Sequence, residues 1–250
     1  MKTVNIREIQ IGTGVPKICV PVTGSTEQEI LEQTRQAAEK KPDLLEWRAD
    51  FYSHLDEREK VAKLAGEMRT ILRQIPIIFT VRTAQEGGNC RISTEDYVNV
   101  LKAAAESREI DLVDVELYKD IPQMEKLIEE LRKMGKKVIA SNHHFHETPA
   151  QEEMEKILKQ MEMSGADIRK LAVMPEEAED VLKLLAATVR ANKTGEAPVI
   201  TMSMSGLGAV SRVCGQVFGS AVTFGTVGAA SAPGQLALEE LRTILEKLQP

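Results

Sequence analysis

Eight short apolar segments recur along this chain, and amphipathic segments separate them. The apolar segments are rich in β-branched residues, as buried strands are. They are 17–22, 44–48, 77–82, 112–117, 137–143, 168–173, 198–204 and 220–225. The segments between them have helical periodicity with charged outer faces, among them 26–40, 57–74, 94–106, 123–134 and 175–192. Strands that alternate with helices predict a parallel sheet covered by helices, an α/β fold.

Eight such strands without a linker predict a TIM barrel, the (β/α)₈ fold, and an open doubly wound sheet is the second choice. A length of 250 residues suits one barrel domain over 1–250. Residues 4–16 alternate and contain two glycines, so they predict an N-terminal β-hairpin that closes the bottom of the barrel. A final helix is expected at about 233–248, with Pro233 in its first turn.

The composition narrows the partners. A net charge of −6, a pI near 5.5 and the lack of a basic block argue against a nucleic acid or an anionic membrane surface. The chain has no apolar leader segment and no run of about 18 apolar residues, so neither secretion nor a membrane span is expected. Three scattered cysteines without a C-x-x-C pair predict reduced thiols and a cytoplasmic location. A small molecule is the expected partner.

Ionisable residues gather at the carboxyl ends of the predicted strands, where buried parallel strands should be apolar. The carboxyl ends are where barrels hold their active sites. The residues are Glu46, Arg48, Arg82, Glu116 and His143, with Lys170 in the sixth strand. A solvated strand end explains any one of them, but ionisable residues in five predicted strands together indicate an active site.

Lys170 lies in the apolar run A-D-I-R-K-L-A-V-M-P. A buried ammonium needs a partner, or it must be neutral for chemistry, and a neutral amine can form an imine with a ketone. Nearby cations favour the neutral amine, and Arg48, Arg82 and Arg212 are the candidates. The structural alternative is a rim lysine whose ammonium reaches water.

His143 is the candidate for proton transfer, since histidine titrates near neutral pH. Glu86 follows the third strand and precedes two glycines, and a carboxylate there can orient an imidazole. The spacing His144-x-His146 also allows two metal ligands, but four histidines in the whole chain leave a metal centre short of ligands.

Two segments near the end of the chain suit substrate binding. Arg212 follows a glycine-containing stretch and can hold a carboxylate in a two-pronged manner. Residues 229–235, A-A-S-A-P-G-Q, are small and follow the eighth strand, so they can form a lid or an ordinary connecting loop.

Together these segments resemble the type I 3-dehydroquinate dehydratase family. The similarity covers nearly the whole chain through E-W-R-A-D (46–50), F-T-V-R-T with E-G-G (79–88), S-N-H (141–143), K-L-A-V-M-P (170–175) and A-S-A-P-G-Q (230–235). The resemblance implies a barrel enzyme without a metal or cofactor that dehydrates 3-dehydroquinate to 3-dehydroshikimate. It also implies a homodimer.

The resemblance implies a role for each candidate residue. Lys170 would form the imine with the ring ketone, His143 would move the proton, and Glu86 would orient His143. Substrate contacts would come from Glu46, Arg48, Arg82, Arg212, Ser231 and Gln235, the last two from the closing loop.

Four positions depart from the family pattern: His144 replaces a usual Asp, and Arg169, Gln216 and Pro21 replace other common residues. His144 is expected to change the charge around His143. Strand alternation directs Arg169 away from Lys170, toward the helices, so its expected effect is structural.

Two other functions stay open at this point. An imine-forming aldolase on the same fold would use a similar lysine, but it usually needs a phosphate site. A protein that binds the substrate without turnover would keep the pocket, and His144 is the feature that favours it. The fold alone does not separate these functions.

Overall fold

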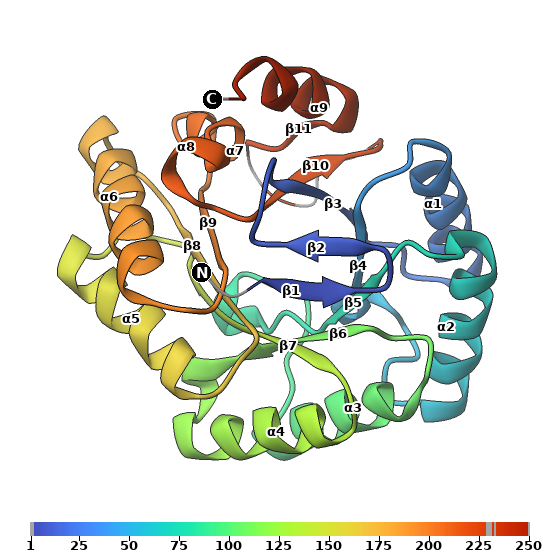
Figure 1. Ribbon diagram of the computed structural model, residues 1–250. Coiled ribbons are helices and arrows are strands. Elements are labelled where there is room, and N and C mark those ends of the chain that lie inside the picture. Colours follow the sequence, from blue (N-terminus) through green and yellow to red (C-terminus); the bar gives the residue numbers. More distant parts are fainter. Residues whose placement is uncertain (1–2, 229–231, 233, 250) are drawn as a thin grey trace.

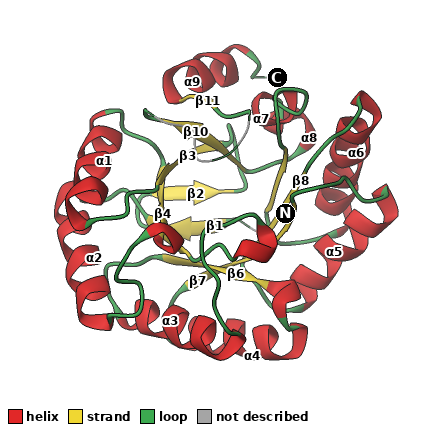
Figure 2. Cartoon of the chain, turned by 180° about the vertical axis from the view of Figure 1, so that it is seen from behind, coloured by secondary structure: helices red, strands yellow, loops and turns green. Residues whose placement is uncertain are grey.

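The computed structural model describes residues 3–228, 232 and 234–249. Eight parallel strands form the barrel, and helices surround them (Figures 1 and 2). The strands are β3 (Lys17–Val22), β4 (Leu44–Arg48), β5 (Ile77–Thr80), β6 (Leu112–Glu116), β7 (Lys137–His144), β8 (Ile168–Val173), β9 (Val199–Ser203) and β10 (Val222–Thr226). The helices are α1 (Glu27–Glu39), α2 (Arg58–Leu72), α3 (Thr94–Glu106), α4 (Ile121–Lys133), α5 (Gln151–Met163), α6 (Ala178–Thr194), α7 (Val210–Val213), α8 (Gly215–Phe218) and α9 (Leu238–Lys247). Short 3₁₀ turns η1 (Ala49–Phe51), η2 (Ala84–Glu86) and η3 (Leu117–Lys119) follow β4, β5 and β6.

The ring closes between β9 and β10. Val199 and Ser220 form a parallel bridge, and the Ala221 amide donates to the Val199 carbonyl at 2.7 Å. The Ser220 side chain extends this seam, since its Oγ accepts from the Thr201 amide at 3.0 Å. Closure confirms the predicted barrel and excludes the open doubly wound sheet.

The predicted N-terminal hairpin is also confirmed. Its strands β1 (Val4–Ile6) and β2 (Ile9–Ile11) are antiparallel and lie across one end of the barrel (Figure 1). Val4, Ile6 and Ile11 pack with residues that begin the barrel strands, such as Leu44 and Ile168. The hairpin therefore covers the amino ends of the strands and leaves the carboxyl ends for a site.

Hydrogen bonds at the helix starts explain where several helices begin. At α1, the Thr26 side chain accepts from the Glu29 amide and Glu29 reaches back to the Thr26 amide, a capping box. The segment expected as a helix from 175 begins only at Ala178, because Glu177 and Asp180 form a similar reciprocal cap there.

The prediction for the last helix was wrong at its start. α9 begins at Leu238, because Leu236 and Ala237 form a short strand, β11, that pairs with Gly225 and Thr226 of β10. Leu236 and Ala237, which helical periodicity predicted within the last helix, therefore belong to the sheet. Pro233 lies outside the described residues.

Candidate active site

Lys170 points into the carboxyl-end half of the barrel and is 4% exposed. Its Nζ lies 3.1 Å from Asp114 Oδ2 and 3.3 Å from Glu46 Oε1, and it sits 4.8 Å from the centre of the Phe224 ring. The three cations predicted near this amine, Arg48, Arg82 and Arg212, line the same cavity. The polar groups that contact Nζ directly are two carboxylates, which attract a positive charge on this amine.

Asp114 is the stronger of the two anchors. Its Oδ1 accepts from Arg82 Nη2 at 2.9 Å and from Ser141 Oγ at 2.6 Å. Burial alone would raise the pKa of Asp114, but the Arg82 and Lys170 charges lower it to about 2. Asp114 is therefore an ionised carboxylate at neutral pH and a fixed counter-charge for Lys170.

His143 ends in the same cavity, near the end of β7. Its Nδ1 lies 2.7 Å from Glu86 Oε2, so the other ring nitrogen, Nε2, is the one left for proton transfer. Burial, with the Arg82 and Lys170 charges, lowers the pKa of His143 well below its usual range. The imidazole is therefore neutral at pH 7.

Glu86 belongs to η2 and is 8% exposed. Its Oε1 accepts from Asn142 Nδ2 at 3.1 Å, which fixes the carboxyl group beside His143. Burial and the nearby Glu116 carboxylate raise the pKa of Glu86 to about 8, although Arg82 opposes this. At neutral pH these shifts favour a protonated Glu86 beside a neutral His143 imidazole.

The glycine pair after Glu86 allows the loop to return to the barrel. Gly87 has φ of +78°, and a Cβ there would overlap the Phe145 ring. A Cβ on Gly88 would overlap the Arg82 carbonyl. The sharp turn expected at this pair is confirmed, and it holds Glu86 beside His143 Nδ1.

The Arg82 guanidinium contacts several of these site residues at once. Besides Asp114, it donates through Nη1 to Glu116 Oε1 at 2.9 Å and to Ser141 Oγ at 3.1 Å, and it lies 3.4 Å from Glu86 Oε2. Glu116 was predicted only as an ionisable strand-end residue without a role, and Asp114 was not among the predicted site residues. Two acids at alternate positions of a buried strand were the signal for them.

The remaining candidates line the same cavity, which has about 60 Å³ of free space. Arg48 is held by Asp50 through two hydrogen bonds of 2.8 Å each. Arg212, in α7, is 2% exposed, and burial lowers its pKa to about 10, so it stays positively charged at neutral pH. Gln235 lines the cavity as well, whereas Ser231 lies outside the described residues.

The structure shows the contacts of three of the four positions that depart from the family pattern. Arg169 is buried and donates to the Ala191 and Ala197 carbonyls, so it points toward the helices as strand alternation predicts. Gln216 donates to the Leu248 carbonyl at 3.2 Å and is not among the residues that line the cavity. His144 Nδ1 lies 3.6 Å from Glu147, and its charge contributes to the low pKa of His143.

The alternative of a metal site gains no support within the described ranges. No group of three His, Cys, Asp or Glu side chains among residues 3–228, 232 and 234–249 is placed to hold a metal ion. His144 points to Glu147, and His146 packs edge-on against Phe145.

Fold and site together define the class of (β/α)₈-barrel enzymes with a buried lysine among the carboxyl ends of the strands. Comparison with known proteins is more specific. The family model for type I 3-dehydroquinase matches residues 18–250. The chain belongs to the type I 3-dehydroquinase family.

Individual relatives agree over almost the full length. The 3-dehydroquinate dehydratase of Clostridium kluyveri is 46% identical over 245 residues, which cover 97% of this chain and 96% of the relative. The crystal structure of 3-dehydroquinate dehydratase from Geobacillus kaustophilus has a TM-score of 0.96 at 40% identity, covering 99% of this chain and 96% of that one. A type I enzyme from Clostridium difficile, solved with covalently modified comenic acid, has the same TM-score and identity, with 99% and 98% covered.

Proposed function

We propose that this protein dehydrates 3-dehydroquinate to 3-dehydroshikimate through an imine on Lys170. One observation carries the proposal: the Lys170 amine and a His143 ring held by Glu86 line one buried cavity. Family membership supports the reaction, and the covalently modified ligand in the C. difficile relative supports a covalent step.

Imine formation requires that the Lys170 ammonium first lose a proton. Glu46 Oε1, 3.3 Å from Nζ, is placed to take it, whereas Asp114, with its low pKa, is placed to stay charged. The amine then attacks the ring ketone carbon, and the resulting hydroxyl leaves as water with the proton returned by Glu46. The product is a protonated imine, whose positive nitrogen withdraws electrons from the adjacent carbon.

Elimination then uses His143. Its Nε2 takes the proton from the carbon next to the imine, and the same proton goes to the departing hydroxyl, which leaves as water. Glu86 stabilises the imidazolium between these two transfers. A water molecule hydrolyses the imine, which releases 3-dehydroshikimate and restores the Lys170 ammonium, so the net change is the loss of one water.

The substrate contacts follow from charge. Arg212 is the proposed partner of the substrate carboxylate, since a buried guanidinium pairs strongly with that group. Glu46, Arg48 and Arg82 are proposed for the ring hydroxyls, and Ser231 and Gln235 for the closing loop. The Lys170–Glu46 contact is the one that the mechanism breaks, since the amine must turn to the substrate ketone.

The first test is the rate of formation of the conjugated product. Lys170→Met should abolish turnover, and His143→Ala should reduce kcat by ~10²–10⁴-fold, the usual share of general acid–base catalysis. Met134→Ala is the control and should keep full activity, since Met134 is exposed and does not line the cavity. A wild-type chain that binds 3-dehydroquinate without making product would instead show a binding protein.

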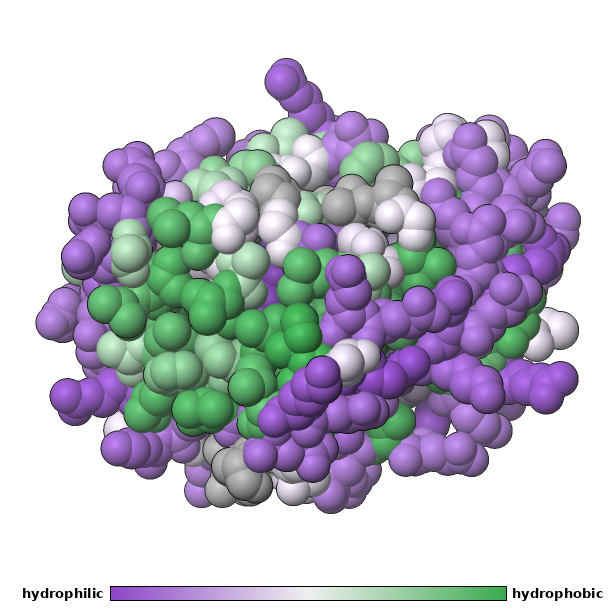
Figure 3. Space-filling model, turned by 90° about the horizontal axis from the view of Figure 1, so that it is seen from above, coloured by the Kyte–Doolittle hydropathy of each residue, from purple (hydrophilic) through white to green (hydrophobic). Residues whose placement is uncertain are grey.

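We also propose that two copies of the chain pair through an apolar face. Leu182 of α6 is 64% exposed, Val210 of α7 52% and Val217 of α8 62%. Figure 3 shows apolar side chains gathered in the left part of the face seen from above. In Figure 1, α6, α7 and α8 lie on that side of the molecule. Exposed apolar patches of this kind commonly cover a protein interface.

The cytoplasmic location stays a prediction. The cysteines Cys19, Cys90 and Cys214 are free thiols, and the described helices include none that could cross a membrane.

A further inference from the structure

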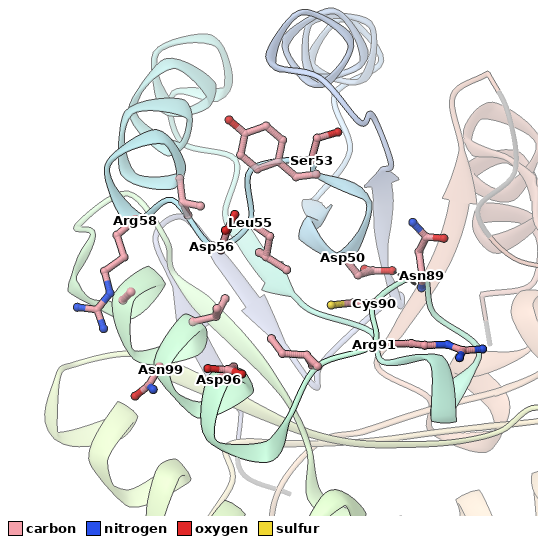
Figure 4. Close-up of a pocket in the computed structure, with 15 residues that line it drawn as sticks. Asp50, Ser53, Leu55, Asp56, Arg58, Asn89, Cys90, Arg91, Asp96 and Asn99 are labelled. Carbon is pink, nitrogen blue, oxygen red and sulfur yellow. Dashed lines mark hydrogen bonds between the residues drawn. The ribbon is translucent and has the colours of Figure 1, made fainter.

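A groove of about 460 Å³ lies outside the barrel, between α2 and α3 (Figure 4). Its size is within the range of small-molecule sites, roughly 300–1,000 Å³. The residues that line it include none of those that line the Lys170 cavity. The groove is therefore a separate site on the same carboxyl-end side of the molecule.

The lining of the groove combines apolar side chains with charges of both signs. The apolar lining residues, here called the floor, include Leu55, Ile92, Val100 and Ala103, and the Cys90 sulfur points toward Leu55 in Figure 4. The charged lining residues, here called the rim, include Asp56, Arg58, Arg91 and Asp96. Asp56 and Arg58 form no ion pair with any described residue, so both are available to a ligand.

Asp50 links the groove to the active site. It lines the groove, while its carboxylate oxygens accept from Arg48 Nε and Nη2, both at 2.8 Å. Oδ2 also accepts from the Asn89 amide at 3.1 Å. Arg48 lines the Lys170 cavity, so a shift of Asp50 moves a group proposed to bind substrate.

The Cys90 backbone makes a second link. Cys90 forms a parallel bridge with Thr83, and its carbonyl accepts from the Ala84 amide at 2.8 Å. The Glu86 amide donates to the Thr83 carbonyl at 3.0 Å, and Glu86 contacts His143. The wall of the groove is thus one end of the loop that positions Glu86.

We propose that this groove binds a small zwitterion with an apolar body, such as an apolar α-amino acid, and that its occupation changes turnover at the Lys170 site. The apolar body matches the floor, the ammonium matches Asp56 and Asp96, and the carboxylate matches Arg58. A ligand with one charge would leave one sign of the rim unmatched. Burial raises the pKa of the Cys90 thiol, which favours non-covalent binding over reaction at this sulfur.

The test uses phenylalanine and leucine as probes, with phenethylamine and 3-phenylpropionate as single-charge analogues. Calorimetry on the wild-type protein should show binding of the zwitterions, and at least tenfold weaker binding of both analogues. With saturating zwitterion, kcat/KM for 3-dehydroquinate should change by about fivefold or more, the lower end of usual coupling between sites.

Matched variants locate the site. Ala103→Trp should fill the groove and abolish both binding and the rate effect, with the basal rate unchanged, whereas Ala103→Ser should behave as wild type. Asp56→Asn and Arg58→Gln should each weaken zwitterion binding. Absence of zwitterion binding, or binding that Ala103→Trp leaves intact, overturns the proposed site.

The rate effect rests on the proposed function, and the calorimetry does not. Binding that Ala103→Trp abolishes, in a chain without dehydratase activity, would overturn the proposed function and keep the site. Such binding with an unchanged rate in an active enzyme would overturn the coupling.

Discussion

Glu86 and His143 hold their protons in a way that sets the pH dependence of catalysis. The pKa of Glu86 is raised to about 8 and that of His143 is lowered, so below pH 8 the pair retains the proton on Glu86. The base form needs an ionised Glu86 that accepts Nδ1–H, which leaves Nε2 unprotonated. That form accumulates as the pH rises through about 8.

The wild-type enzyme should therefore show kcat/KM rising with pH through about 8, because this quantity reports ionisations of the free enzyme. Glu86→Gln removes the group that titrates, so the variant should lose this rise. Its rate should fall less than the ~10²–10⁴-fold expected for loss of His143 itself. A rise near pH 8 that persists in Glu86→Gln would show that another group titrates there.

His144 gives a second prediction for single residues. Its charge helps to lower the pKa of His143, so a carboxylate at this position should raise that pKa. An NMR titration of the imidazole signals should therefore show a higher His143 pKa in His144→Asp. His146→Asp, on an exposed ring, is the control and should leave His143 almost unchanged. An unchanged His143 titration in His144→Asp would contradict the effect of residue 144 on the pKa of His143.

The sequence predicted which chemical groups share the site, but it did not predict which of them contact one another. The residue types at the strand ends predicted that Lys170, His143 and Glu86 share one site, and the structure brings them together. The predicted cations Arg48, Arg82 and Arg212 line the cavity of Lys170, but the direct contacts of its amine with Asp114 and Glu46 were not predicted. These acids belong to strands that are not neighbours of β8, so their distances depend on the curvature of the barrel, which a strand pattern does not encode.

At the scale of elements, the turn after η2 leaves no room for a side chain beside the site. Gly87→Ala places a Cβ against the Phe145 ring at a positive φ. It should lower the free energy of unfolding by ~1–2 kcal/mol from backbone strain and a further ~1–3 kcal/mol from crowding. Gly135→Ala is a matched control, since Gly135 has φ of +84° and open space around it.

Urea unfolding followed by circular dichroism measures both variants. Gly135→Ala should lose only the backbone share and keep full activity, while Gly87→Ala should also lose activity because the turn holds Glu86. Equal losses of stability in the two variants would contradict the packing against Phe145.

The predicted elements were most accurate where local signals decided them. The capping residue Thr26 and the apolar run from Leu44 to Arg48 coincide with observed boundaries. The start of the last helix was missed because Leu236 and Ala237 pair with β10, a contact that depends on tertiary structure. Ser220 was expected within the eighth strand, but its side chain completes the seam of the barrel instead.

For the whole molecule, the apolar face over α6–α8 predicts a dimer. Sedimentation velocity should show a dimer for the wild type. A charge in a buried apolar interface is costly, so Val217→Glu should shift the protein to monomer. Met134→Glu, at another exposed apolar residue outside this face, should remain dimeric. A wild-type monomer at micromolar concentration, or a dimeric Val217→Glu variant, would contradict the proposed pairing.

The barrel as a whole brings side chains from β4 and β6 to the amine that β8 carries and places His143 of β7 in the same cavity. Covalent trapping tests the role of this amine most directly. His143→Ala should still form the imine but release it slowly. Incubation of this variant with 3-dehydroquinate, reduction with borohydride and peptide mass spectrometry should therefore find the adduct on Lys170. An unmodified Lys170, or an adduct that persists in Lys170→Met, would contradict the account.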